Sequence, residues 1–343
     1  MMNLLVTGGA GFIGTNFVKY VMNFRKDWSV TVLDKLTYAG RRENLAEYEG
    51  SSRYNFIKGD ICDPVVVSKA MNGCDCVVNF AAETHVDRSI DDPASFVRTD
   101  VEGVRVLLEE FKKERSRKVF LQISTDEVYG SVEEGRSHEG DPLDPRSPYS
   151  ASKAGGELLA MSYFTTFDVP VMVTRASNNY GPYQYPEKLI PLFVTNAFEG
   201  ERLPLYGDGG NMRDWMFVTD HCSALVATLE KGEPGSIYNI GAGQEMTNKE
   251  VTHAILEATG ADHALIRFVE DRLGHDRRYA LDISRSREFL GWQPETDFAT
   301  GIALTVDWYR ENSQWWKLIK SGEFREYYKR MYSSRLENSE RTR

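Results

Sequence analysis

The chain opens with Asn3-Leu4-Leu5-Val6-Thr7-Gly8-Gly9-Ala10-Gly11-Phe12-Ile13-Gly14, an apolar stretch that runs directly into a glycine-rich turn. The apolar stretch predicts a strand, and a helical pattern follows the turn to about Met22. Gly9, Gly11 and Gly14 have the spacing of a dinucleotide-binding turn, and Gly8, Gly11 and Gly14 fit its wider variant. Because glycine also serves ordinary turns, the strand before and the helix after are what predict a pyrophosphate site.

A second predicted strand, Ser29-Val30-Thr31-Val32-Leu33-Asp34, ends in a carboxylate about twenty residues after the last glycine of the turn. Asp34 in that place accepts hydrogen bonds from an adenosine ribose and repels a 2′-phosphate, which favours NAD over NADP. Lys35 follows it and weakens the exclusion of NADP. The competing interpretation is a solvated aspartate at the end of a strand.

Further apolar runs alternate with helical segments along the first half of the chain. The predicted strands cover residues 54–61, 76–84, 119–123 and 169–175, and the predicted helices cover residues 65–71, 93–112 and 148–167. Strands that alternate with helices predict an α/β fold with a doubly wound parallel sheet. The two longer helices carry broad apolar faces, which suit packing on the sheet and, in addition, pairing with a second copy of the chain.

Polar residues follow the predicted strand 119–123 as Ser124-Thr125-Asp126-Glu127-Val128-Tyr129-Gly130, at an end of the sheet where α/β proteins bind ligands. Ser147 and Pro148 are typical of a helix start, which would put Tyr149 and Lys153 four residues apart on one helical face. A nearby ammonium favours the phenolate, so we expect Tyr149 to accept a proton near neutral pH. The stretch therefore offers an acid and two bases in Asp126, Glu127 and Tyr149.

The character of the sequence changes at Asn178-Asn179-Tyr180-Gly181-Pro182, which is rich in amides, aromatics and turn formers. We expect a smaller ligand-binding part to begin here. It contains a set of cations that suit bidentate phosphate contacts and hence a diphosphate ligand, although a solvated charged surface is the alternative: Lys188, Arg213, Arg272, His275, Arg277 and Arg278. His85 is either a ligand contact or a structural histidine.

Composition excludes several classes of function. The 343 residues carry 41 Lys and Arg against 51 Asp and Glu, a net charge of −10, which argues against binding to nucleic acid polymers or anionic membranes. The sequence has no apolar run long enough to span a bilayer and no basic leader, so we expect a cytoplasmic protein. The four cysteines form no disulfide framework, and the histidines lack metal-ligand spacing, so we expect no metal site.

Taken together, the glycine turn, the Tyr149/Lys153 pair and Asn179-Tyr180-Gly181-Pro182 resemble the extended short-chain dehydrogenase/reductases that act on nucleotide sugars. The adjacent Asp126-Glu127 pair is most similar to the 4,6-dehydratases of that family, because relatives that only epimerise or decarboxylate generally lack it. The resemblance runs from Leu4 to about Tyr309. It implies a Rossmann-type sheet, a smaller and partly discontinuous C-terminal substrate domain, and a homodimer that pairs through two helices of the NAD domain.

The resemblance also implies a set of site residues. Cofactor contacts would fall on Gly8, Gly11, Phe12, Ile13, Gly14, Asp34, Lys35, Thr37, Asp60, Ile61, Ala81, Ala82, Thr99, Tyr149, Lys153 and Asn178. Substrate contacts would fall on Thr84, Thr125, Asn179, Lys188, Leu189, Pro204, Tyr206, Arg213, Asn248, Arg272 and His275. We expect an NAD-binding domain at 1–177 with return segments near 216–242 and 279–284, a mainly nucleotide-sugar-binding domain at 178–330, and a tail at 331–343.

The implied reaction is the dehydration of dTDP-glucose with bound NAD. Tyr149, with Lys153, would deprotonate the 4-hydroxyl as hydride leaves carbon 4. Glu127 would then remove the carbon 5 proton, while Asp126 protonates the departing 6-hydroxyl and Thr125 bonds nearby. Two alternatives stay open: a dehydratase or 4-epimerase for another nucleotide sugar such as UDP-glucose, and a non-catalytic NAD-binding protein on the same fold.

Overall fold

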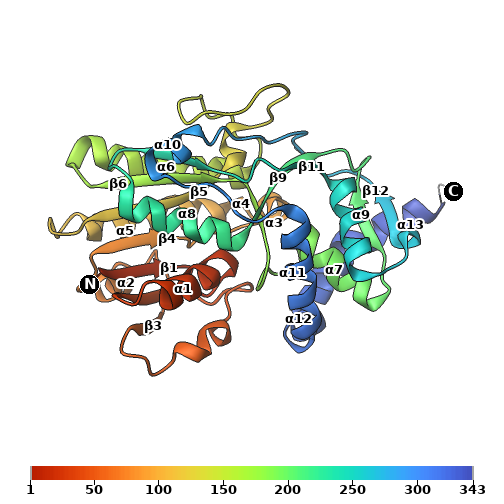
Figure 1. Cartoon of the computed structure of the whole chain (residues 1–343), viewed down its shortest axis with the longest axis horizontal. Coiled ribbons are helices and arrows are strands. Elements are labelled where there is room, and N and C mark those ends of the chain that lie inside the picture. Colours follow the sequence, from red (N-terminus) through yellow and green to blue (C-terminus); the bar gives the residue numbers. More distant parts are fainter. Residues whose placement is uncertain (1, 342–343) are drawn as a thin grey trace.

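A computed structural model describes residues 2–341 and has a parallel sheet at its centre (Figure 1). In the described part of the chain this sheet has seven strands, all paired in parallel. Their order across the sheet is β10 (Ile237–Ile240), β6 (Val171–Ala176), β5 (Val119–Thr125), β4 (Cys76–Asn79), β1 (Met2–Thr7), β2 (Trp28–Asp34) and β3 (Tyr54–Lys58). The doubly wound parallel fold predicted from the sequence is confirmed.

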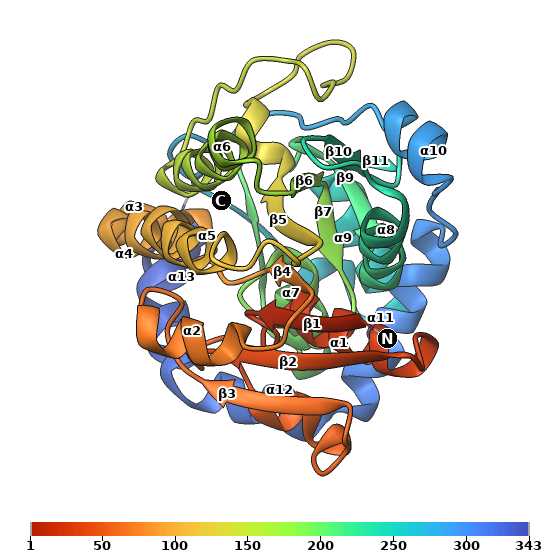
Figure 2. The ribbon, with the colours of Figure 1, turned by 90° about the vertical axis from the view of Figure 1, so that its left-hand side faces the viewer.

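Helices cover both faces of the sheet, as Figure 2 shows. One face carries α2 (Pro64–Met71), α5 (Val104–Phe111) and α6 (Pro148–Phe167), and the other carries α1 (Phe12–Phe24) and α8 (Val218–Lys231). From β1 the chain first builds the sheet toward β2 and β3, and then crosses to β4 and continues in the opposite direction. A crevice opens at such a reversal, beyond the carboxyl ends of the strands, and it is where these sheets bind ligands.

Helix α6 begins where the sequence predicts, because its capping residues are local. Ser147 caps the helix through a reciprocal pair of hydrogen bonds with Ser150, and Pro148 occupies the first turn. The preceding strand, β5, is buried at every position and runs two residues further than expected, to Thr125. Strand and helix therefore bring the polar stretch after Ile123 and the face of α6 with Tyr149 to one end of the sheet.

The single helix expected over 93–112 is wrong in detail. It consists of α4 (Pro93–Val97), a π-helical segment (Arg98–Gly103) and α5. At Gly103 a side chain would overlap Ile61, and at Gly156 it would overlap the backbone oxygen of Asp100, so both glycines allow close packing here. The π-helical segment carries Thr99, which lines the crevice, and the buried Asp100; π-helical turns are frequent at functional sites.

A smaller part of the molecule lies beside the sheet and has its own apolar core (Figure 1, right). One of its small sheets joins β11 (Glu245–Thr247), β9 (Met212–Phe217) and β7 (Asn178–Tyr180), and the other joins β12 (Ile266–Val269) and β8 (Leu203–Tyr206). Its helices are α7 (Leu189–Glu199), α9 (Asn248–Thr259), α11 (Phe298–Glu311), α12 (Ser313–Ser321) and α13 (Glu323–Arg341). Between β9 and β11 the chain returns to the large sheet as α8 and β10.

The remaining short elements connect these parts. They are α3 (Val86–Asp91), α10 (Ser284–Leu290) and three 3₁₀ segments, Arg42–Tyr48, Asp126–Tyr129 and His263–Leu265. All four cysteines are free thiols, and Cys76 and Cys222 are buried in the core. Within residues 2–341, none of the helices combines the length and apolar character that crossing a bilayer requires.

The prediction of a tail at 331–343 is wrong for most of that segment. Residues 331–341 continue α13, and Tyr332 is buried in the core of the smaller part. The polar residues of this segment lack a clear helical pattern, so the sequence did not reveal that Tyr332 faces inward. Residues 342 and 343 of the expected tail lie outside the described part of the chain.

Candidate active site

One crevice follows the carboxyl edge of the large sheet and continues between the two parts of the molecule. Its first section is lined by the glycine turn and by the ends of β2, β3 and β4. Its middle section holds the catalytic candidates on β5 and α6, and its last section lies within the smaller part. Glu127, Asn179 and Lys188 line both the middle and the last section, so the two adjoin.

The glycines of the turn have different physical roles. Gly8 has φ +66° and lies against the backbone of Ala81, where a Cβ would be 2.6 Å from the Ala81 nitrogen. At Gly14 a Cβ would overlap Gly8, which fixes the close approach of helix α1 to the turn. Gly11 caps α1, and the nearest atom to a Cβ built there would be the Gly8 carbonyl oxygen at 3.4 Å. The first N–H groups of α1 therefore border a space that suits a pyrophosphate.

Asp34 is buried, so the interpretation of a solvated aspartate is wrong. Its two carboxylate oxygens accept hydrogen bonds from the backbone N–H of Ala10 (2.9 Å) and of Leu36 (2.8 Å). Burial raises the pKa of this carboxyl. Asp34 thus ties the glycine turn to the end of β2, while Lys35 is engaged in an ion pair with Asp60 (2.8 Å).

Every residue proposed as a cofactor contact lines the first or middle section of the crevice. The strands β3 and β4 are shorter than expected and end at Lys58 and Asn79. Asp60, Ile61, Ala81 and Ala82 consequently lie in the loops that form the crevice wall, rather than inside the strands.

The adjacent carboxyls differ strongly in environment. Asp126 is buried, and burial together with the nearby Glu127 raises its pKa to about 8. Its Oδ1 accepts a hydrogen bond from the Thr125 hydroxyl (3.1 Å), while within residues 2–341 its Oδ2 finds no partner. Glu127 is less buried and borders two sections of the crevice. At neutral pH Asp126 is therefore protonated and available as an acid.

The Tyr149 phenol differs from the expectation of a readily formed phenolate. Burial, followed by the charges of Glu127, Asp100 and Asp126, raises the pKa of Tyr149. Lys153 is also buried, which lowers its pKa, and its ammonium donates to the Ile123 carbonyl oxygen (2.7 Å). The fold buries the phenol and brings the carboxylates around it. The prediction from the spacing of Tyr149 and Lys153 alone therefore gave the pKa shift of Tyr149 the wrong sign.

Asp100 was missed from the sequence, where it lies in the middle of a predicted helix. Its carboxylate accepts hydrogen bonds from the Ser152 hydroxyl (2.7 Å) and from the Glu83 backbone N–H (2.9 Å). Burial raises the pKa of Asp100 to about 6, and its charge in turn favours the protonated form of Lys153. No signal in the sequence set Asp100 apart, because charged residues such as Arg98, Glu102 and Arg105 surround it.

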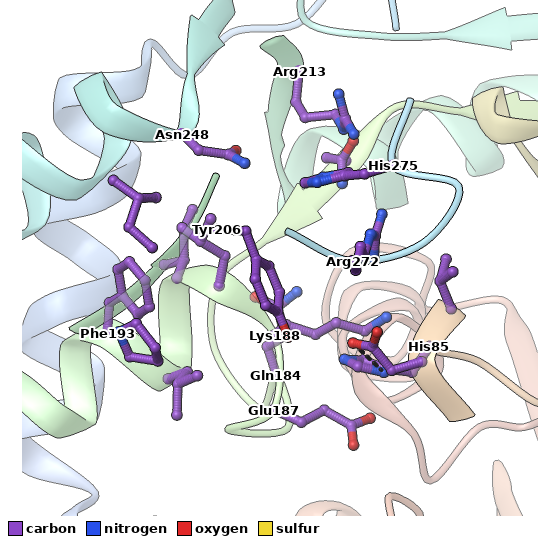
Figure 3. A pocket seen from close by; sticks show the side chains of 18 of the residues that line it. His85, Gln184, Glu187, Lys188, Phe193, Tyr206, Arg213, Asn248, Arg272 and His275 are labelled. Carbon is purple, nitrogen blue, oxygen red and sulfur yellow. Dashed lines mark ion pairs between the residues drawn. The ribbon is translucent and has the colours of Figure 1, made fainter. Parts of the chain in front are cut away.

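The last section of the crevice collects positive charge, and Figure 3 shows its side chains converging. Arg213 is buried, donates to the Asp276 carbonyl oxygen (2.8 Å) and stacks on the Tyr279 ring at 4.2 Å. The Lys188 ammonium donates to the Thr84 hydroxyl (3.4 Å). All the residues proposed as substrate contacts line the middle or last section.

Two of the expected phosphate cations point elsewhere. Arg277 pairs with Asp208 (2.8 Å) and Arg278 with Glu245 (2.7 Å), so the solvated or structural interpretation applies to them. His85, by contrast, is buried and lines the crevice, with its Nδ1 3.3 Å from the Tyr327 hydroxyl. Burial holds the pKa of His85 well below its usual value, so the ring is neutral.

Sequence reasoning also missed the buried Glu187 next to Lys188. Glu187 accepts hydrogen bonds from Tyr38 (2.7 Å) and from Arg88 (2.9 Å), and the Arg88 guanidinium stacks on the Tyr38 ring at 3.7 Å. These contacts join the loop after β2, helix α3 and the loop that carries Lys188. They depend on residues far apart in the chain, which no local pattern connects.

The Rossmann sheet, the glycine turn and the Tyr149/Lys153 pair on one helix define a short-chain dehydrogenase/reductase of the extended type. The family model described as GDP-mannose 4,6 dehydratase matches residues 5–305. A dTDP-glucose 4,6-dehydratase of Streptomyces niveus is 51% identical over 93% of this chain and 96% of its own length. The low-salt glycan biosynthesis protein Agl12 of Haloferax volcanii is 52% identical over 90% of this chain and 98% of its own.

Among solved structures, the fold matches DesIV, a dTDP-glucose 4,6-dehydratase of Streptomyces venezuelae crystallised with NAD and TYD bound. The TM-score is 0.91 at 49% identity, over 93% of this chain and all of the other (100%). The chain therefore belongs to the dTDP-glucose 4,6-dehydratase family.

Proposed function

We propose that this chain converts dTDP-glucose into dTDP-4-keto-6-deoxyglucose with NAD as a cofactor that is regenerated in each turnover. The observation that carries the proposal is the pair of adjacent carboxyls beside Tyr149, of which Asp126 is held protonated and Glu127 faces the crevice. A 4-epimerase would have no need of this acid and base. The names of its relatives and the NAD in the DesIV structure support the same assignment.

The residues of the first and middle sections fit NAD. The N-terminus of α1 at Gly11 would hold the pyrophosphate, and Asp34 and Asp60 border the place for the adenosine. The Asn178 side-chain oxygen is buried without a hydrogen-bond partner among the described residues, which suits a polar group of the cofactor. Bound NAD would take hydride from carbon 4 and return it to carbon 6, and its positive ring would favour the Tyr149 phenolate.

The protein's own groups would move three protons. Tyr149 takes the proton of the 4-hydroxyl as carbon 4 is oxidised to a ketone. Glu127 removes the proton of carbon 5, which the ketone has made acidic, and Asp126 gives its proton to the 6-hydroxyl, which leaves as water. Carbon 5 is reprotonated when hydride returns to carbon 6, so the product has lost one water and keeps the oxidation state of the sugar overall.

The last section would hold the nucleoside diphosphate. Lys188, Arg213 and Arg272 bring positive charge to a diphosphate, and the Arg272 Nε is buried without a partner in the described chain. Asn248, Pro204 and Tyr206 line the same section and suit the nucleoside.

To test the assignment, the purified protein is incubated with dTDP-glucose and, separately, with UDP-glucose, and the products are analysed by mass and by NMR of the ring protons. We expect loss of one water and a 4-keto-6-deoxy product from dTDP-glucose. A galactose isomer would instead indicate an epimerase, and conversion of UDP-glucose alone would move the substrate assignment to the uridine sugar.

The dehydration step should slow as the pH rises through about 8, the pKa of Asp126. Below this value the carboxyl carries the proton that the departing 6-hydroxyl needs, and above it the proton is lost. Water loss and carbon 4 oxidation are followed together in single-turnover experiments at a series of pH values. A rate of water loss that stays flat or increases through this range would exclude Asp126 as the acid.

We also propose that the two parts of the chain bind different ligands. We further propose that the protein is cytoplasmic. Residues 1–177, with the returning segments near 216–242 and 279–284, would bind NAD, and residues 178–330 would mainly bind the nucleotide sugar. The return of α8 and β10 to the large sheet supports this division. The net charge of −10 supports the proposal that the protein binds neither nucleic acid polymers nor membranes.

A homodimer through α4, α5 and α6 is the proposed assembly. These helices stand together on one face of the molecule (Figure 2), and Val97, Leu158 and Phe167 on them are exposed by 56%, 59% and 41%. Large apolar side chains gathered on one face are typical of an interface between subunits.

Leu158→Arg should convert this dimer into a monomer, because two copies of the new charge would be buried at the interface. Sedimentation velocity measures the change. Leu304→Arg on α11, where the leucine is similarly exposed at 50%, is the matched control and should leave the mass unchanged. If Leu158→Arg sediments like the unmodified protein, the interface lies elsewhere.

A further inference from the structure

The last helix, α13, connects residues of both parts around the substrate section of the crevice. The Tyr327 hydroxyl lies 3.3 Å from Nδ1 of His85, which follows β4 of the large sheet. Tyr328 accepts a hydrogen bond from Asn196 on α7 (3.2 Å), and the Phe324 ring packs on Tyr185 with ring centroids 6.0 Å apart. The helix is thus held in place on two sides of the substrate section.

Two further residues of α13 act on a side chain that lines this section. Tyr332 is buried, lines the crevice itself, and has its ring 6.0 Å from that of Tyr206. Arg335 donates a hydrogen bond from Nη1 to the Tyr206 hydroxyl (2.8 Å), and its guanidinium carbon is 5.1 Å from the centre of the Tyr206 ring.

These contacts determine what the Tyr206 hydroxyl can do. Its oxygen already accepts a hydrogen bond from Arg335, so its own proton is available for an acceptor in the crevice. Figure 3 shows the Tyr206 ring reaching into the crevice toward Lys188. The His275 ring lies edge-on to it at 6.2 Å, and the charges of Asp87 and Arg272 both act on its hydroxyl. A ligand group that accepts this proton beside Lys188 and Arg272 is an anion, such as a phosphate oxygen.

We propose that Arg335 on α13 is a positioning residue for the diphosphate of the substrate, because it orients the Tyr206 hydroxyl as a hydrogen-bond donor into the crevice. The identity of the ligand as a nucleoside diphosphate sugar rests on the proposed function. The second half of α13, which the sequence indicated as part of a tail at 331–343, is on this account part of the substrate site. The reacting carbons are handled by residues on β5 and α6.

Arg335→Met keeps the length of the side chain and removes its donors. We expect dTDP, measured by titration calorimetry, to bind about tenfold more weakly, and the KM for dTDP-glucose to increase by about the same factor. The kcat should change by less than about twofold, since the interaction is present in both the ground and the transition state. Arg335→Lys, which retains a donor, should recover most of the affinity.

Arg330→Met is the matched control on the same helix. Arg330 pairs with Asp91 (3.1 Å) at the surface, so its replacement should leave dTDP binding and KM unchanged. Tyr206→Phe removes the acceptor and leaves α13 intact. If Arg335 acts through this hydroxyl, the double variant Arg335→Met with Tyr206→Phe binds dTDP no more weakly than Tyr206→Phe alone.

Unchanged dTDP binding by Arg335→Met, or a double variant weakened by the product of the two single effects, would overturn the proposal. If Arg335→Met melts at a lower temperature than Arg330→Met, the dTDP affinity of Tyr206→Phe is compared with that of the unmodified protein. Equal affinities would refute the inference. Because dTDP binding needs no turnover, a protein that binds dTDP as described but does not dehydrate dTDP-glucose would refute the proposed function and still support this inference.

Discussion

Replacing Tyr149 with phenylalanine is expected to slow the conversion of dTDP-glucose by about 10²–10⁴-fold while NAD stays bound. The substitution removes only the hydroxyl, so the ring keeps its place at the crevice, where it packs edge-on against Phe96. Without a group to take the 4-hydroxyl proton, carbon 4 is not oxidised, and neither water loss nor hydride return can follow. The near-ultraviolet absorbance of reduced cofactor in a single turnover measures this first step.

Tyr163→Phe provides the control for a lost phenol on the same helix. Tyr163 lies on α6 away from the crevice, and its hydroxyl is hydrogen-bonded to Glu109. This variant should turn over normally. Retention of most of the activity by Tyr149→Phe, within about tenfold of the unmodified protein, would remove Tyr149 from the mechanism.

The second large effect is expected from Asp126→Asn and Glu127→Gln, each of which should reduce dehydration by about 10²–10⁴-fold while carbon 4 is still oxidised. The two variants differ in what happens at carbon 5. In deuterated water, Asp126→Asn retains the base and should exchange the carbon 5 proton for deuterium, whereas Glu127→Gln should not. Mass spectrometry and NMR of the recovered sugar measure the exchange.

Each of these carboxyl variants serves as the control for the other, because they are adjacent, similar in size and different in proposed role. Equal exchange in both variants would mean that Glu127 is not the base. Loss of carbon 4 oxidation in both would indicate that the pair holds the substrate in place rather than handling protons.

The elements that could be predicted from the sequence are those set by a local pattern of neighbouring residues. The glycine turn lies between β1 and α1, and the Ser147-Pro148 start of α6 occurs where it was expected, since both are set by neighbouring residues. The residues that line the crevice could also be predicted from the sequence, because parallel strands bring their carboxyl ends to one edge of the sheet. Their roles as cofactor, substrate and catalytic groups remain proposals.

What the sequence did not reveal depends on contacts between distant segments. The π-helical segment that positions Asp100 packs closely against other segments at Gly103 and Gly156. The aromatic residues of α13 have helical spacing, but the core that buries them is built from distant parts of the chain. The pKa of Tyr149 was predicted in the wrong direction because the phenol is buried, and approached by Glu127 and Asp100, only in the folded chain. Electrostatics at this site is a property of the tertiary structure.

The most direct test of the central claim follows a deuterium label placed at carbon 4 of dTDP-glucose. If the protein oxidises carbon 4, loses water across carbons 5 and 6, and returns the same hydride, the label appears in the carbon 6 methyl group of the 4-keto-6-deoxy product. Mass spectrometry and NMR locate it. A label returned to carbon 4 of an isomeric hexose, or lost to water, would contradict the account.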